Sequence, residues 1–543
     1  MNTKFFLIVL ILVAILSSAC GAKQATVATY PTSANKPAQP EAPKATSPNY
    51  QAPLPTQAPA ATYNPSNNPS NPLPTQPPMS QPGTVPTPAD NYFKDYGVNP
   101  FSDTREDHLS TFGLDVDTAS YTVMRRYITD GNLPPAESIR VEEYVNYFHQ
   151  GYPNPEGVAF GIYADGAPSP FHRDGTYILR FGVQGYYVPE WERKPAVLTF
   201  VIDVSGSMSM ENRLELVKQS LQLLVDRLTQ DDTVSIVVYG SSARVLLNPT
   251  NGQDHNTILN AIYSLQPEDT TNAEAGLRLG YKMAMQAYRS DAINRVILCT
   301  DGVANVGETG PEAILQEVKG YVNEGVTLTA VGFGMGNFND VLLEELADNG
   351  NGNYAYVDNI DEARKLFVEN LTSTLQVIAR DAKVQVDFNP DVVAYYRLIG
   401  YENRAIADQD FRNDRVDAGE IGAGHSATAL YAVIFRSNAQ GRIATVQLRW
   451  KDPQNYQVVE INGNFNTWDL ARSFEEASPR YQLAVIVAQY AELLRQSPWA
   501  EGTTFAQLTG YASRLREFLP EDPDVVEFSN LVQRASQISP WGR

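Results

Sequence analysis

Between residues 194 and 376 the chain alternates short apolar runs with segments whose apolar residues recur at helical spacing. The apolar runs predict buried strands at residues 196–202, 234–239, 243–247, 295–299, 326–332 and 354–357. The segments between them predict helices from about residue 214 to 228 and at 273–288, 311–323, 340–347 and 361–375. Strands that alternate with helices in this way indicate a parallel sheet with helices on both faces. We therefore expect a doubly wound, Rossmann-like α/β domain here.

Shorter segments on both sides of this domain predict further sheet. The expected strands are residues 158–163 and 177–183 before it, and 382–388, 394–399, 427–435 and 444–450 after it. The later ones alternate apolar and polar residues, which is typical of a sheet with one face in water. These strands form either one β-sandwich split by the α/β domain or two small separate sheets. Helices are expected at 479–495, 505–518 and 525–538, and the first is apolar nearly all round and therefore buried.

The beginning of the chain has the pattern of an export signal. Lys4 is followed by an unbroken apolar run at residues 5–16, and then by Ser17, Ser18, Ala19 and Cys20. A charged start, a short apolar run and small residues are typical of a secretory signal peptide. A cysteine at the end resembles a bacterial lipoprotein signal, in which that cysteine carries the lipid. We predict lipidation at Cys20; the alternative is an ordinary signal peptide with a chance cysteine.

Residues 21–90 hold 17 of the 36 prolines and only five charged residues. This composition cannot bury enough apolar surface to fold, so we predict a disordered, Pro-rich tether. The predicted organisation is a lipoprotein signal peptide (1–20), the tether (21–90), an N-terminal segment with helices and strands (91–193), the α/β domain (194–376), sandwich strands (377–465) and C-terminal helices (466–543). The expected location is the outer face of the bacterial cell membrane, at the cell surface or in the periplasm.

Charge and cysteine content exclude several classes of function. The net charge is −21, from 41 basic and 62 acidic residues, whereas a nucleic-acid-binding protein needs a basic surface. The same charge leaves the N-terminal lipid as the expected contact with a membrane. Two cysteines exclude a disulfide framework and a cysteine-rich metal site. We expect Cys299, inside a predicted strand, to be a small core residue.

Oxygen-bearing side chains follow two of the predicted strands and precede a predicted helix. Asp203, Ser205 and Ser207 follow the first strand, Asp301 follows the strand at 295–299, and Thr271 precedes the helix at 273. Ligands of open α/β sheets bind at the carboxyl ends of the strands. Carboxylates and hydroxyls without imidazole or thiolate suit Mg²⁺, Mn²⁺ or Ca²⁺. Capping of helices and turns explains any one of these residues, but not all five at one sheet edge.

This set resembles the metal-ion-dependent adhesion site of von Willebrand factor type A (vWA) domains. The resemblance implies that Ser205, Ser207 and Thr271 coordinate the ion directly, while Asp203 and Asp301 act largely through water. Mg²⁺ is the expected ion, with Mn²⁺ or Ca²⁺ as alternatives.

Residues outside the motif extend the resemblance. Stretches at residues 109–121, 140–148, 331–337, 396–404 and 417–425 resemble a subfamily of bacterial vWA lipoproteins that has its own segments before and after the vWA domain. We expect Asp115, Asp117 and Thr118 to end a strand and cap a helix that starts near Ala119; the alternative is a second cation site.

The expected function is divalent-cation-dependent protein binding, in adhesion or assembly, without enzymatic activity. An acidic residue of a partner protein can fill the open coordination position of the ion. One alternative is a metal-assisted hydrolase, but no His, Lys or perturbed carboxylate pair stands out near the motif as a general base. Another is an assembly factor for an ATPase complex, against which the signal sequence argues.

Overall fold

A computed structural model describes residues 91–114, 116–172, 174–268, 270–302, 311–335, 338–416 and 418–539. In this part of the chain, six strands form the sheet of the central domain in the order β10-β9-β8-β5-β6-β7. They are β5 (Ala196–Asp203), β6 (Thr233–Tyr239), β7 (Ala243–Asn251), β8 (Ile293–Thr300), β9 (Val326–Phe333) and β10 (Tyr354–Val357). Neighbouring strands are parallel except β6 and β7, which are antiparallel. The predicted doubly wound α/β domain is therefore confirmed, with one antiparallel edge strand.

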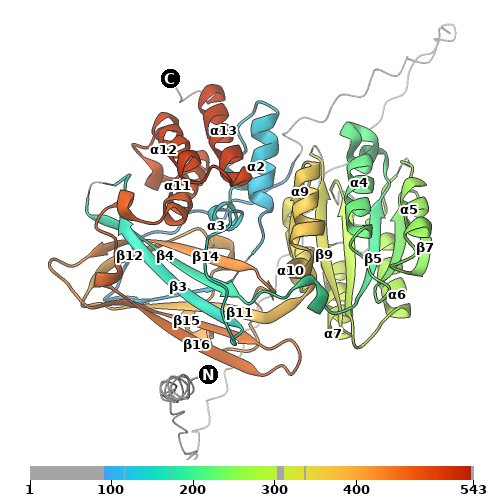
Figure 1. Ribbon diagram of the computed structural model, residues 1–543, viewed down its shortest axis with the longest axis horizontal. Coiled ribbons are helices and arrows are strands. Elements are labelled where there is room, and N and C mark those ends of the chain that lie inside the picture. Colours follow the sequence, from blue (N-terminus) through green and yellow to red (C-terminus); the bar gives the residue numbers. More distant parts are fainter. Residues whose placement is uncertain are drawn as a thin grey trace, which may run out of the picture. The chain divides into compact units, whose positions relative to one another are not determined.

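Helices cover both faces of this sheet (Figure 1). One face packs against α4 (Arg213–Val225), α5 (His255–Tyr263) and α9 (Ile360–Arg364), and the other against α6 (Ala273–Gln286), α7 (Pro311–Asn323) and α8 (Asp340–Asn349). Helix α6 lies close to β5 because residue 280 is glycine. A Cβ atom there would lie 2.2 Å from Cγ2 of Val201.

The strands before and after the central domain form one β-sandwich. One sheet has the order β1-β12-β14-β4-β3 and the other β13-β11-β15-β16, with β2 beside β11. The strands are β1 (Ser102–Asp103), β2 (Leu109–Gly113), β3 (Phe160–Pro168), β4 (Thr176–Gly185), β11 (Val377–Phe388), β12 (Val393–Ile399), β13 (Ile421–Gly422), β14 (Ser426–Phe435), β15 (Arg442–Lys451) and β16 (Val458–Asn466). Since β4 pairs with β14 and the central domain lies between them in sequence, that domain is inserted into the sandwich. Side chains of both sheets, among them Phe181, Tyr431 and Val446, share one core.

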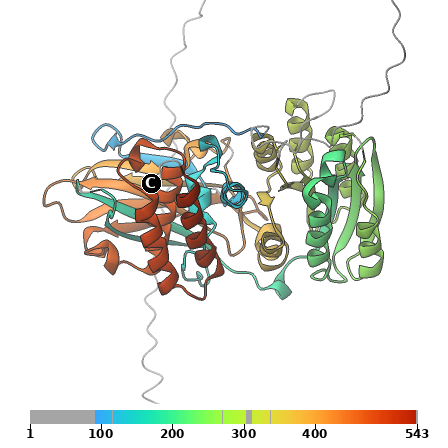
Figure 2. The ribbon, with the colours of Figure 1, turned by 90° about the horizontal axis from the view of Figure 1, so that it is seen from above.

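The C-terminal helices cover the outer face of the sheet that contains β4 and β14 (Figure 2). They are α11 (Pro479–Leu494), α12 (Phe505–Phe518) and α13 (Pro523–Ile538), and they pack together with α2 (Ala119–Thr129) and α3 (Val141–Asn146). Helix α11 is buried nearly all round, as its apolar composition predicts. Among the described residues, no helix combines the length and apolar character needed to cross a membrane.

Buried ion pairs connect the central domain to α2 and α3. Arg140, which precedes α3, donates from Nη1 to Oδ2 of Asp340 in α8 over 2.6 Å, and its Nε pairs with Glu143. Arg125 of α2 lies 2.5 Å from Asp358, which follows β10, and also pairs with Glu362 of α9. Buried charges require such partners, so these pairs hold α8 and α9 against the helices of the surrounding fold.

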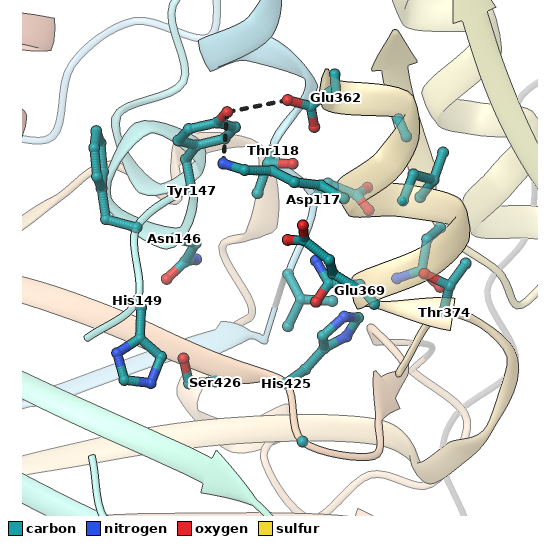
Figure 3. A pocket seen from close by; sticks show the side chains of 18 of the residues that line it. Asp117, Thr118, Asn146, Tyr147, His149, Glu362, Glu369, Thr374, His425 and Ser426 are labelled. Carbon is teal, nitrogen blue, oxygen red and sulfur yellow. Dashed lines mark hydrogen bonds between the residues drawn. The ribbon is translucent and has the colours of Figure 1, made fainter. Parts of the chain in front are cut away.

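A polar cavity of about 290 Å³ lies at the same junction (Figure 3). Within it, Lys365 Nζ donates to the Tyr147 hydroxyl over 2.9 Å, and that hydroxyl donates to Oε2 of Glu362 over 3.0 Å. Lys365 also pairs with Asp524 at 2.5 Å. Lys365 of the central domain thus bonds to Tyr147 and Asp524 of the surrounding fold and adds to the connection between the two parts.

The start of α2 differs from the sequence-based expectation. Asp115 lies outside the described residues, and the Thr118 side chain makes no capping hydrogen bond. Asp117 accepts from the backbone N–H of Tyr354 over 3.1 Å instead. The first turn of α2 is satisfied by Glu143, which accepts from the backbone N–H of Ser120 over 2.7 Å. A cap by the Thr118 side chain is therefore not formed, and a carboxylate from α3 accepts one of the first N–H groups of the helix, while the role predicted for Asp115 stays a prediction.

Candidate functional site

The carboxyl ends of β5 and β8 bring two aspartates to one edge of the central sheet. The two strands are parallel neighbours, with Ile202 opposite Cys299, so Asp203 and Asp301 end up side by side. Asp203 is 0% exposed and Asp301 is 2% exposed. The Thr300 hydroxyl donates to Oδ2 of Asp203 over 2.9 Å and fixes the orientation of that carboxyl.

The two serines of the motif complete this cluster. The backbone N–H of Ser205 donates to Oδ1 of Asp203 over 2.8 Å, which turns the loop back over the end of β5. The hydroxyl oxygens of Ser205 and Ser207 lie 3.1 Å apart, and the Ser207 hydroxyl also bonds to Asp301. Two adjacent ligands of an octahedral Mg²⁺ would be roughly 3.0 Å apart at its usual bond length, so the spacing of the serines suits such an ion.

The loop before Thr271 is tied to the same edge of the sheet. The backbone N–H of Glu268 donates to the carbonyl of Val204 over 2.5 Å, which holds the loop beside Ser205. Thr271 is half-buried, and Asn272 after it caps α6 by accepting from the N–H of Ala275 over 3.0 Å. Four of the five predicted residues are thus joined by hydrogen bonds, and Thr271 follows Glu268 by three residues in the chain. Cys20 lies outside the described residues.

Burial disfavours the ionised form of the Asp203 and Asp301 carboxyl groups. Burial and the charge of Asp301 raise the pKa of Asp203 to about 6. Burial also raises the pKa of Asp301, although hydrogen bonds from Ser207 and Arg213 oppose that shift. These shifted pKa values belong to the two aspartates of the motif itself, and the expectation that no general base stands out beside the motif stays a prediction. Two buried carboxylates in proximity favour a bound positive charge, because the cation relieves their repulsion.

The donor set of this site fits a hard divalent cation. Within the described ranges, no three His, Cys, Asp or Glu side chains lie close enough to hold a metal ion together. An ion at this edge therefore depends on the serine and threonine hydroxyls, the two aspartates and water. Mg²⁺ commonly keeps several waters and one or two carboxylates, so this mixture suits it.

Two further residues shape the surroundings of the site. Arg213, at the start of α4, donates from Nη1 to Oδ2 of Asp301 over 2.6 Å. The motif does not include this arginine, but its position four residues before Val217 and eight before Leu221 places it on the buried face of α4.

Cys299 is a buried free cysteine as predicted, and burial raises the pKa of its thiol well above the usual range.

Comparison with known proteins adds the family. Residues 198–386 match the model of the von Willebrand factor type A domain, residues 87–179 a model described as von Willebrand factor, and residues 373–538 a model described as "Uncharacterized protein YfbK, C-terminal". The chain is 34% identical to "Uncharacterized protein YfbK" of Escherichia coli (strain K12) over 492 residues. The aligned residues cover 85% of this chain and 83% of that protein. The chain belongs to the YfbK family of bacterial vWA proteins. Proteins with vWA domains typically mediate protein–protein interaction or adhesion, and these domains commonly bind a divalent cation.

More distant proteins share parts of this YfbK-family chain. Human "Inter-alpha-trypsin inhibitor heavy chain H3" is 30% identical over 304 residues, which is 53% of this chain but 31% of that protein. Among solved structures, "von Willebrand factor type A from Catenulispora acidiphila" has a TM-score of 0.41 at 16% identity and covers 69% of this chain and 89% of that one.

Proposed function

We propose that this YfbK-family protein binds a partner protein through a divalent cation, with Mg²⁺ as the preferred ion. Ser205, Ser207 and Thr271 would hold the ion directly, and Asp203 and Asp301 largely through water. The proposal is supported by the hydrogen bonds that join Asp203, Ser205, Ser207 and Asp301 at the carboxyl edge of β5 and β8. Binding is a better proposal than hydrolysis because both carboxyls are enclosed by protein.

The partner group that this arrangement favours is a carboxylate. Protein ligands and waters leave the ion a coordination position toward solvent, and an incoming acidic side chain can replace a water there. The chain itself carries a net charge of −21, so without the ion a carboxylate would be repelled. Both arguments make the cation a condition of binding.

Chelation should abolish partner binding. A partner is first captured by crosslinking on whole cells, and its binding to the purified protein is then measured with and without EDTA. Ser205→Ala combined with Ser207→Ala should act like EDTA, because it removes two direct ligands. Ser264→Ala is the matched control: Ser264 is exposed, and its hydroxyl donates to the Ala261 carbonyl over 2.7 Å at the end of α5. Binding that survives both EDTA and the double substitution would contradict the proposal.

We also propose that the protein is exported and anchored on the outer face of the cell membrane by a lipid on Cys20. The support is the charged start, the apolar run at residues 5–16 and the small residues before the cysteine. Metabolic labelling with a fatty-acid analogue should mark the wild type and Cys299→Ser but not Cys20→Ser. Cys299 is the matched control because it is the other cysteine and is buried. An unlabelled wild type that is released from the cells would contradict the anchor.

A further inference from the structure

A buried arginine lies among the residues of the cation site. The Arg213 side chain is 2% exposed, and Nη1 donates to Oδ2 of Asp301 over 2.6 Å. Its Nη2 donates to the carbonyl of Met335, in the loop after β9. One guanidinium thus joins the start of α4 to the ends of β8 and β9, the two strands on one side of the site.

The backbone around Arg213 leaves space for its side chain and directs it toward Asp301. Gly334 has a φ of +86°, and a Cβ atom there would lie 2.3 Å from Nε of Arg213, so a side chain at 334 would displace the guanidinium. Immediately before Arg213, Glu211 and Asn212 adopt left-handed φ values of 50° and 59°, a conformation that such residues adopt at a cost. The chain therefore uses unusual backbone on both sides to bring this charge to Asp301.

Among the residues that the structure describes, Asp301 is the buried carboxylate that pairs with Arg213. Glu211 lies 3.9 Å from Nη2, but it bonds to Arg126 of α2 at 2.9 Å and is 34% exposed. Its charge is therefore shared with a second arginine and screened by solvent. In the described part of the chain, the buried charges at the site are those of Asp203, Asp301 and Arg213, with a total of −1 when both carboxyls are ionised.

We infer that Arg213 is the counter-charge of the cation site, which offsets the charge of Asp301 and leaves the ion-loaded site with a net charge of +1. This inference rests on the proposed function and extends it. Two carboxylates alone would neutralise a divalent ion, and the loaded site would then attract a neutral ligand about as well as an anionic one. With Arg213 present, an anionic group from the partner both neutralises the remaining positive charge of the site and fills the open coordination position of the ion. The arginine thus weakens the binding of the ion and strengthens the selection of a carboxylate.

The direction in which metal affinity changes when Arg213 is replaced distinguishes a counter-charge from a residue that only positions Asp301. Arg213→Met removes the charge and keeps much of the volume, so the full-length protein should bind Mn²⁺ and Mg²⁺ roughly tenfold more tightly or better, because a positive charge near the ion is gone. Arg213→Lys keeps the charge and should stay close to the wild type. Titration calorimetry with the metal alone measures both, after a thermal transition has shown that each variant is folded. A scaffold would give the opposite sign, since a misplaced Asp301 weakens binding.

Acetate probes the selection of the anion. Water proton relaxation of bound Mn²⁺ reports how readily acetate replaces a coordinated water, and chloride serves as the control. The wild type and Arg213→Lys should lose that water at several-fold lower acetate concentration than Arg213→Met. Metal binding by Arg213→Met that is weaker than or equal to the wild type, or equal acetate displacement in all three proteins, would overturn the counter-charge. A folded wild type that binds neither Mn²⁺ nor Mg²⁺ would instead overturn the proposed function, and the inference with it.

Discussion

Asp203→Asn should abolish measurable divalent-cation binding while the protein stays folded. Asp203 and Asp301 supply the negative charges of the site, and an amide at 203 leaves the ion facing Arg213 with one carboxylate. At the effective dielectric constant of protein sites, losing a charge this close to a divalent ion costs several kcal/mol, which corresponds to an affinity loss of about 100-fold or more. Calorimetric titration with Mg²⁺ measures this loss. Binding by Asp203→Asn as tight as that of the wild type would contradict the site.

Asp254→Asn is the matched control for this substitution. Asp254 is exposed and caps α5 by accepting from the N–H of Thr257 over 3.3 Å. The same change of a carboxylate to an amide there alters the net charge of the protein equally but leaves the site intact. This variant should bind Mg²⁺ like the wild type, so that a general effect of net charge is excluded.

Without the ion, Asp203→Asn should not lower the thermal transition. The folded state raises the pKa of Asp203 from 3.8 to about 6, so the folded protein holds this proton to higher pH than the unfolded chain. The stability that the protonated form contributes is present below a pH of about 4 and is lost as the pH rises through about 6. At neutral pH the ionised carboxyl therefore opposes folding, and a neutral amide removes that opposition. A transition that falls by many degrees would show a structural role instead.

The same pKa gives the wild type a pH-dependent affinity. A proton and a divalent ion compete for Asp203, so affinity for Mg²⁺ should fall about tenfold between pH 7 and pH 5. Titrations at the two pH values test this. An affinity that does not change over this range would mean that Asp203 does not need to ionise when the ion binds.

The central sheet could be predicted from sequence because its inner strands are buried on both faces. The apolar run at 196–202 corresponds to β5, all of whose residues are buried, and the run at 295–299 lies within β8. Elements with few buried positions were missed. Edge strand β16 buries only Phe465, and α5 buries only Ile258 and Ile262, so neither has enough apolar residues to establish a period.

The residues of the candidate site likewise fall into those that could be predicted from the sequence and one that could not. Asp203, Ser205, Ser207 and Asp301 follow predicted strands, so the geometry of a parallel sheet is enough to bring them to one edge. Arg213 could not be placed in this way, because its contact with Asp301 depends on the path of the chain through residues 206–212. Its position on the apolar face of α4 was the available signal: a charged residue in a buried register requires a partner of opposite charge.

We expect the attachment of the central domain to the surrounding fold to depend on buried charges as well as on packing. Replacing Arg140 tests this expectation. Arg140 is 4% exposed and lies between Glu143 of α3 and Asp340 of α8, both 1% exposed. The Tyr354 hydroxyl also donates to Asp340 over 2.8 Å, but it brings no charge. Arg140→Met keeps most of the volume and leaves two buried carboxylates without their cation.

Arg140→Met should lower the free energy of unfolding by about 3–5 kcal/mol, because breaking a buried ion pair leaves an uncompensated charge. Urea unfolding followed by fluorescence and by circular dichroism measures the loss, and a separate transition of the central domain would show that its connection to α3 is what fails. Arg412→Met is the matched control: Arg412 pairs with Glu460 at 2.5 Å but is 60% exposed, so its loss should cost at most about 1 kcal/mol. Changing Asp340 to Asn together with Arg140→Met should recover part of the lost stability, since it removes one of the stranded charges. An Arg140→Met protein as stable as the wild type would show that packing alone holds α8 against α3.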